Sequence, residues 1–158
     1  DEAAHDPRST DLRMKVVLQR VLSASVSVDG AISGSIGCGY LLLVGIAVGD
    51  DESTVRRLAT DVAKARLMPD SQGKMGVNLR DAGGEALAVS QFTLLADFSK
   101  GNRPSFNGAA RPELARPLFD LFVAELSTHL GRPVPTGVFG ADMRVELVND
   151  GPVTVVLE

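Results

Sequence analysis

The stretch GYLLLVGIAVGDDESTVRRLATDVAKARLMP, residues 39–69, decides the architecture of this chain. Residues 40–48 are apolar on both alternating faces, a pattern typical of a central strand that is covered on each side. Asp50 and Asp51 follow and supply an N-cap and negative charge for a helix start. Apolar residues then recur at helical spacing, so we expect an amphipathic helix over residues 52–67. A buried strand followed directly by a helix predicts an α/β fold.

The segments on either side of this stretch add more strands and one more helix. Asp29-Gly30 favours a two-residue hairpin turn, and a second helix is expected to begin near Pro112 and to be closed by Gly131 and Pro133. The expected strands, rich in β-branched residues or alternating in polarity, are residues 15–21, 25–28, 31–36, 86–95, 143–148 and 153–157. This order predicts a layered α/β/β sandwich with mixed β-sheets and two main helices.

Length and composition indicate one ordinary folded domain. The 158 residues are 44% hydrophobic and 23% charged, and the longest apolar run falls far short of the roughly 20 residues of a membrane span. Residues 1–13 hold almost nothing apolar, so we expect a flexible tail before a single domain at residues 14–158. One cysteine and the lack of a signal-peptide pattern favour a reducing, cytoplasmic compartment.

The net charge of −4 means that any contact with nucleic acid must be local. Residues 100–117 carry four basic side chains and one acidic side chain. Lys100 and Arg103 in this segment are candidate contacts for the phosphates of an RNA. The plainer alternative is a solvated loop and the start of a helix.

The usual catalytic side chains are scarce. The chain has two histidines, His5 in the expected tail and His129 near a helix end, and neither is placed as a general base. Cys38 stands between two glycines without a basic neighbour, so we expect a packed thiol. Neither a metal site nor a nucleotide cofactor is indicated, because no His/Cys cluster and no phosphate-binding loop is present.

Two short motifs point to a site nonetheless. Ser90-Gln91-Phe92-Thr93 ends an apolar strand and exposes main-chain N–H groups and hydroxyls where pairing stops, although satisfied strand caps are an equal alternative. Asn149-Asp150-Gly151-Pro152-Val153-Thr154 joins two expected strands. Asp150-Gly151 alone would be a hairpin turn, but Pro152 removes a ladder donor and allows a cis bond.

Four motifs in order make the chain resemble the D-aminoacyl-tRNA deacylases, over residues 14–158. They are SQFT at residues 90–93, KGNRPSF at 100–106, GVFGADM at 137–143 and NDGPVT at 149–154. The resemblance implies a homodimer without a cofactor that hydrolyses the ester between a D-amino acid, or glycine, and the terminal adenosine of tRNA. It also implies that L-aminoacyl-tRNA is spared.

The resemblance further implies where the site lies. Gly151-Pro152, in cis, would reach from one subunit into the pocket of the other and act as the chiral filter, and Arg20 would hold it in place. The pocket floor would be formed by Ser90, Gln91, Phe92 and Thr93, with Phe139 and Met143 nearby at the adenosine. Leu95 stands where the family often has an aromatic residue, and residues 76–78 also depart from the usual pattern.

Catalysis would then use main-chain donors and the 2′-hydroxyl of the substrate, because an aminoacyl ester is already activated. Without a histidine, Thr93 is a poor nucleophile and is assigned to binding and packing. Two alternatives stay open from the residues alone: a dimeric nucleic-acid-binding module without catalysis, and an α/β dimer that binds a small molecule.

Overall fold

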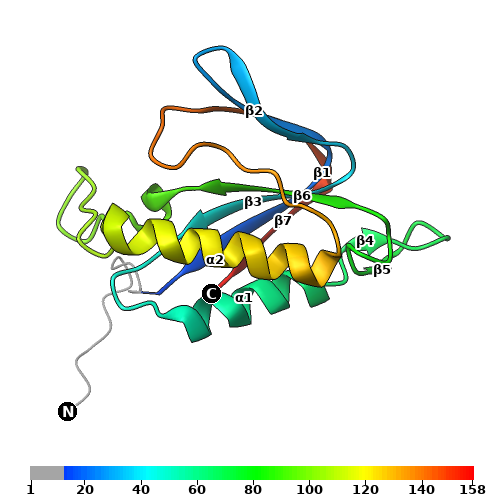
Figure 1. Cartoon of the computed structure of the whole chain (residues 1–158), viewed down its shortest axis with the longest axis horizontal. Coiled ribbons are helices and arrows are strands. Elements are labelled where there is room, and N and C mark those ends of the chain that lie inside the picture. Colours follow the sequence, from blue (N-terminus) through cyan, green and yellow to red (C-terminus); the bar gives the residue numbers. More distant parts are fainter. Residues whose placement is uncertain (1–12) are drawn as a thin grey trace.

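A computed structural model describes residues 13–158 of the chain (Figure 1). Apart from Arg13, the tail expected at residues 1–13 lies outside the described residues. The elements are β1 (Lys15–Val28), β2 (Ala31–Ile36), β3 (Gly39–Gly45), α1 (Glu52–Lys64), β4 (Met68–Pro69), β5 (Met75–Val77), β6 (Glu85–Ser90), the short 3₁₀ helix η1 (Phe92–Leu95), α2 (Pro112–Leu130) and β7 (Arg144–Leu157).

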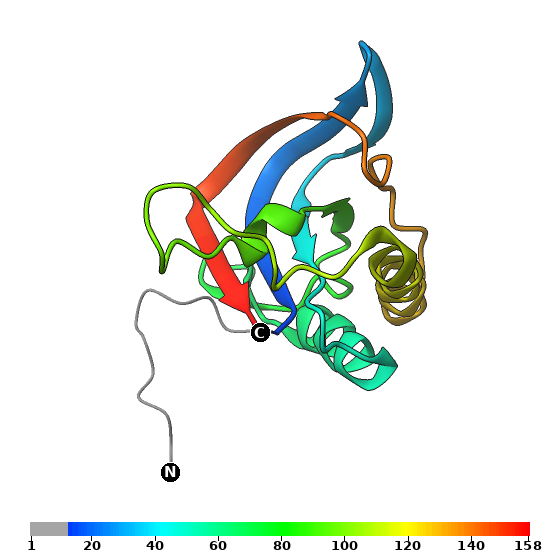
Figure 2. The ribbon, with the colours of Figure 1, turned by 90° about the vertical axis from the view of Figure 1, so that its left-hand side faces the viewer.

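Five of these strands form one mixed sheet in the order β2-β1-β3-β6, with β7 also paired to β1. The first half of β1 pairs with β3, its second half pairs with β2, and β7 runs antiparallel along both halves. β3 and β6 are parallel. Because the two long strands continue from one part of the sheet into the other, the sheet curls over itself (Figure 2).

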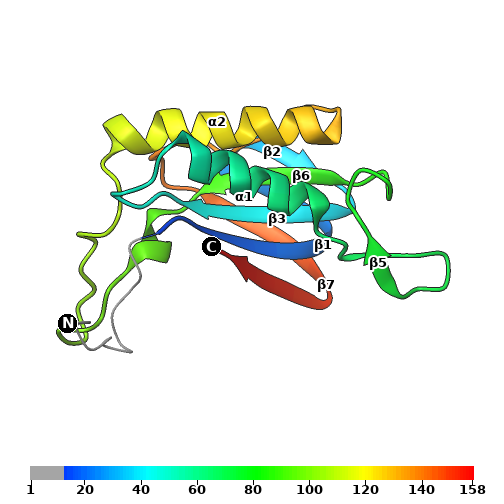
Figure 3. The same ribbon diagram turned by 90° about the horizontal axis from the view of Figure 1, so that it is seen from below.

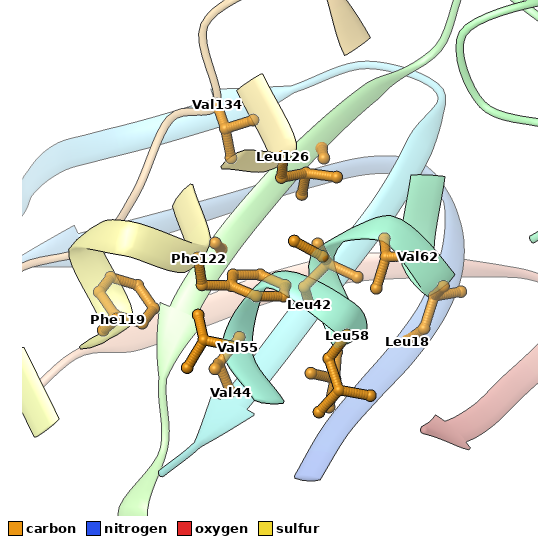
Figure 4. Close-up of a cluster of buried hydrophobic side chains, with 14 of the residues drawn as sticks. Leu18, Leu42, Val44, Val55, Leu58, Val62, Phe119, Phe122, Leu126 and Val134 are labelled. Carbon is orange, nitrogen blue, oxygen red and sulfur yellow. The ribbon is translucent and has the colours of Figure 1, made fainter. Parts of the chain in front are cut away.

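Both helices cover one face of the sheet and lie side by side (Figure 3). Leu42 and Val44 of β3 point into the core beneath them, against Leu58 of α1 and Phe122 of α2 (Figure 4). Leu41 belongs to a second core on the opposite face. β3 is therefore covered on both faces, as its uninterrupted apolar pattern predicts, and the predicted fold class is confirmed.

The structure corrects the expected helix end. Asp51 is the N-cap and accepts the N–H of Thr54 at 3.0 Å, as expected, but the helix ends at Lys64 instead of residue 67. Long-range hydrogen bonds stop it early: the Leu67 carbonyl accepts from Arg20 at 2.7 Å, and β4 pairs with β5.

Three expected strand assignments are also wrong. The strands expected at residues 143–148 and 153–157 form one strand, β7. Residues 15–21 and 25–28 belong to one continuous strand, because β7 pairs across the short gap between them. The strand expected at residues 86–95 ends at Ser90, where the chain turns into η1.

Cys38 is exposed in the turn before β3, so the expectation of a packed thiol is wrong.

No helix within residues 13–158 has the length and apolarity to cross a membrane.

Candidate active site

A cavity of about 700 Å³ opens between the sheet and the start of α2. It collects segments that are far apart in the sequence: the end of β3, residues 89–93, residues 106–119 and residues 139–145. Six of the predicted site residues line it, namely Ser90, Gln91, Phe92, Thr93, Phe139 and Met143. Phe106, the last residue of KGNRPSF, lines it as well, so the structure brings three of the four sequence motifs together around one space.

One side of the cavity is formed where β6 turns into η1. The N–H of Gln91 makes the last sheet bond, to the Val44 carbonyl at 2.8 Å, and the Leu94 N–H closes back onto the Gln91 carbonyl. The N–H groups of Phe92 and Thr93 have no acceptor within residues 13–158, as expected for the first residues of a helical turn. Two main-chain donors are thus available to a ligand.

Gly45 allows this turn to lie directly on the end of β3. A Cβ atom at this position would be 2.6 Å from Cδ2 of Leu95 and 3.0 Å from the Gln91 carbonyl oxygen. A glycine inside a buried strand is a sequence signal for such a close approach. The position of the two donors therefore depends on a residue outside the four motifs.

Four phenylalanine rings contribute to the walls of the cavity. The Phe119 and Phe139 ring centroids are 6.1 Å apart, and the Arg116 guanidinium lies 5.9 Å from the Phe139 centroid. Phe92 and Phe106 meet edge to face with centroids 5.1 Å apart. Such rings suit a planar ligand that packs against them.

Three of these residues escaped the sequence analysis as site residues. Phe106 had a signal, because it ends the KGNRPSF motif, whereas helical spacing gives no sign that Phe119 and Arg116 of α2 would meet Phe139. The Met143 side chain packs directly against the main chain of Gly137, where a Cβ atom would lie 2.5 Å from the Met143 sulfur. Only glycine at position 137 leaves room for it.

Gly151 and Pro152 lie elsewhere, in a bulge of β7. Gln19 pairs with Thr154 and Val21 pairs with Asn149, so residues 150–153 leave the ladder opposite Arg20 alone. The hairpin considered for Asp150-Gly151 is wrong, because both halves of β7 pair with β1 and the chain keeps its direction. The Gly151–Pro152 peptide is cis, and both residues are exposed.

Side chains on both sides hold this bulge. The Asn149 side chain accepts the Val153 N–H at 2.9 Å and donates to Oγ1 of Thr154 at 3.0 Å. Nε of Arg20 is buried and faces Oδ2 of Asp150 at 3.2 Å, an ion pair that is not aligned as a hydrogen bond. Arg20 is anchored in turn by its bond to the Leu67 carbonyl, so the bulge is tied to the segment after α1.

The bulge and the two predicted RNA contacts do not line the cavity of their own chain. Gly151, Pro152 and Arg20 are absent from its walls, as are Lys100 and Arg103. Lys100 and Arg103 are exposed on the loop between η1 and Phe106.

Asp50 fixes the loop that follows β3 at the edge of the cavity. Its carboxylate accepts the N–H of Ala47 at 2.6 Å and the N–H of Met14 at 3.2 Å. Burial raises the pKa of this carboxyl above its ordinary value of 3.8, although both hydrogen bonds act in the opposite direction.

We expect Asp50→Asn to change how stability depends on pH. A raised folded pKa means that the stability contributed by this group is present below pH 3.8 and is lost as pH rises through the folded pKa. The amide does not ionise and escapes this loss. The unfolding free energy of the variant, relative to the wild-type chain, should therefore increase between about pH 3 and about pH 7 in urea titrations. A constant difference over this range would contradict the expectation.

Within residues 13–158, no group of three or more His, Cys, Asp or Glu side chains is arranged to hold a metal ion. The arrangement is an aromatic cavity with free main-chain donors, and no histidine is among the described residues that line it.

Comparisons with known proteins place this arrangement in a class. The family model described as D-Tyr-tRNA(Tyr) deacylase matches residues 17–158. The D-aminoacyl-tRNA deacylase of Chromobacterium violaceum is 59% identical over 92% of this chain and 97% of that protein, and the one from Thermomicrobium roseum is 59% identical over 92% and 94%. The class is therefore that of the deacylases, which are hydrolases.

Solved structures show that the fold is shared with known proteins. A structure titled c-Myc DNA Unwinding Element Binding Protein is 37% identical, with a TM-score of 0.85 over 91% of this chain and 97% of that one. A probable eukaryotic D-amino acid tRNA deacylase, at 14% identity and a TM-score of 0.80, shares the fold over 91% of this chain and 98% of that one. The chain belongs to the D-aminoacyl-tRNA deacylase family, and the resemblance inferred from the four motifs is confirmed.

Proposed function

We propose that this chain hydrolyses the ester bond of D-aminoacyl-tRNA. The observation that carries the proposal is the aromatic cavity with the unpaired N–H groups of Phe92 and Thr93, in a chain of this family. The adenine of the terminal adenosine stacks near Phe139 and Met143, and the aminoacyl group extends toward Ser90, Gln91, Phe92 and Thr93. A tRNA substrate also implies that the protein acts in the cytoplasm.

The two main-chain donors fit the charge that develops during ester hydrolysis. Water attacks the ester carbonyl carbon, and the carbonyl oxygen becomes an oxyanion that accepts from the N–H groups of Phe92 and Thr93. The bond to the ribose oxygen then breaks, so the amino acid leaves as a carboxylate and the ribose oxygen is protonated. The neighbouring 2′-hydroxyl of the substrate assists this proton transfer. A single preorganised donor of this kind is worth about 10²–10³ in rate.

Chirality is read by a second subunit. In the proposed homodimer, the carbonyl oxygens of Gly151 and Pro152 of one subunit face the α-carbon of the substrate held by the other. An L side chain would clash with them, whereas a D side chain, or the hydrogen of glycine, has room. The exposure of this bulge and its absence from the cavity of its own chain support the arrangement. Exclusion discriminates more strongly than a lost contact, which is worth only about 1–3 kcal/mol.

The decisive experiment compares D-tyrosyl-tRNA, L-tyrosyl-tRNA and glycyl-tRNA with purified protein. We expect release of D-tyrosine and glycine and no measurable release of L-tyrosine. Equal rates on the D and L esters would refute the chiral filter. Salt-sensitive binding of tRNA without release from any ester would instead favour a non-catalytic nucleic-acid-binding module.

Thr93→Ala should retain most of the activity, within about tenfold of the wild-type rate. The Thr93 hydroxyl is engaged by the Gln91 side-chain amide at 2.5 Å, and the substitution keeps the main-chain N–H that we assign to the oxyanion. Single-turnover release of D-tyrosine measures the effect. A loss as complete as that from removing a nucleophile would overturn the main-chain mechanism.

A further inference from the structure

The loop between η1 and α2 begins and ends at the cavity. Asp97 and Ser105 bond each other through both main-chain N–H and carbonyl groups, each at 2.8 Å, so the loop closes on itself. Residue 93 on one side of this closure and Phe106 on the other both line the cavity. The loop projects away from the sheet as the yellow-green segment of Figure 2. Residues 97–106 are called the 97–106 loop below.

A hydrogen-bonded turn at the start of this loop presents an aromatic ring. The Ser99 N–H donates to the Asp97 carboxylate at 2.8 Å, and the Gly101 N–H donates to the Phe98 carbonyl at 3.2 Å. Phe98 itself is 52% exposed and belongs to neither hydrophobic core. A ring that is held in place by such a turn can stack on a ligand without the additional cost of ordering the loop on binding.

The cations beside Phe98 are unpaired. Lys100 and Arg103 are exposed, and within residues 13–158 neither side chain makes a salt bridge. Residues 97–117 carry four basic and two acidic residues in a chain whose net charge is −4. The loop is thus a local positive region that continues from the cavity.

We propose that the 97–106 loop binds the unpaired nucleotides that precede the terminal adenosine of the tRNA. Phe98 stacks on one base, and Lys100 and Arg103 meet the neighbouring phosphates. Aromatic stacking combined with cations is how proteins hold single strands without reading sequence. The inference rests on the proposed function, because the adenosine in the cavity sets the path of the strand.

A second copy of this chain fits the 97–106 loop less well as a binding partner than a nucleic acid does. A two-fold axis that passed through the loop would bring Lys100 and Arg103 against the same residues of the other copy, and like charges that face each other oppose association. The phosphates of a nucleic acid supply the complementary charge.

The test compares kcat/KM on D-tyrosyl-tRNA with kcat/KM on the D-tyrosyl ester of adenosine alone. Phe98→Ala should lower the value for tRNA about tenfold and leave the value for the adenosine ester unchanged, whereas Phe98→Tyr should keep both. Ile32→Ala, which trims another exposed apolar side chain on β2, serves as the control and should change neither.

The cations are tested by salt dependence. Replacing both Lys100 and Arg103 by alanine should flatten the slope of log kcat/KM for tRNA against log salt by about 1.4. Replacing the exposed Lys64 and Lys74 by alanine removes the same charge elsewhere and should leave the slope unchanged.

Three results would overturn the inference. An equal loss by Phe98→Ala on both substrates would place Phe98 in the catalytic pocket. A change in oligomeric state by sedimentation would place it in a subunit interface. An unchanged kcat/KM for tRNA would show that the loop does not touch the strand. Wild-type protein that cleaves neither ester would instead refute the proposed function, and the inference with it.

Discussion

Gly151→Ala is expected to lower hydrolysis of D-aminoacyl-tRNA by about 100-fold, the size of effect that a displacement of about 1 Å at a reacting centre produces. Gly151 has φ +125°, a conformation that side chains rarely adopt. A Cβ atom there would lie 2.9 Å from Cγ2 of Val153 and 3.3 Å from Nη2 of Arg20. The bulge must shift to relieve these contacts, and the carbonyl oxygens of the proposed filter shift with it.

Gly30→Ala is the matched control. Gly30 also has a positive φ, +81°, but nothing lies within 4 Å of a Cβ built there, in the turn between β1 and β2. The Gly30→Ala variant should have a lower free energy of unfolding than the wild type and the same rate of hydrolysis of D-tyrosyl-tRNA. A Gly151→Ala protein that is folded by circular dichroism and as active as the wild type would refute the proposed role of the bulge.

Subunit mixing shows whether the bulge acts in the other subunit. Ala141→Trp places a large ring in the cavity and should be inactive on its own. Mixed with Gly151→Ala subunits, it forms heterodimers in which one cavity and one bulge are intact and meet. Random exchange should therefore restore about a quarter of the wild-type activity. No recovery, despite heterodimers seen by native mass spectrometry, would mean that each bulge serves its own chain.

Phe122→Ala is expected to cost about 3–5 kcal/mol of unfolding free energy. The Phe122 side chain is fully buried at the centre of the core between both helices and β3 (Figure 4). Removing the ring loses its burial and leaves a cavity that the surrounding sheet and helices close only in part. For a chain of this length the loss corresponds to a fall of roughly 6–20 °C in Tm, measured by thermal unfolding.

Leu114→Ala, on the same helix, is the control for Phe122→Ala. Leu114 is 42% exposed, so its truncation should change Tm by only a small fraction of the Phe122→Ala effect. Similar shifts for the two variants would show that the helices do not derive their stability from this core.

Much of the fold and part of the site could be predicted from short-range patterns. The apolar run of residues 40–48 predicts a strand covered on both faces, because successive side chains point to opposite sides of a strand. Asp51 could be recognised as an N-cap, since it acts only three residues along the chain, on Thr54. The position of Ser90-Gln91-Phe92-Thr93, at a strand end with free main-chain donors, is equally local.

The tertiary structure alone decided how distant segments meet. It joined residues 15–28 into one strand and made residues 150–153 a bulge, because both results depend on pairing between β1 and β7 across more than a hundred residues. It also brought Arg20 to Asp150 and Phe119 to Phe139. Side-chain alternation and helix capping depend on residues that are close in the sequence. Sheet register and contacts between elements are determined only when the whole core is packed.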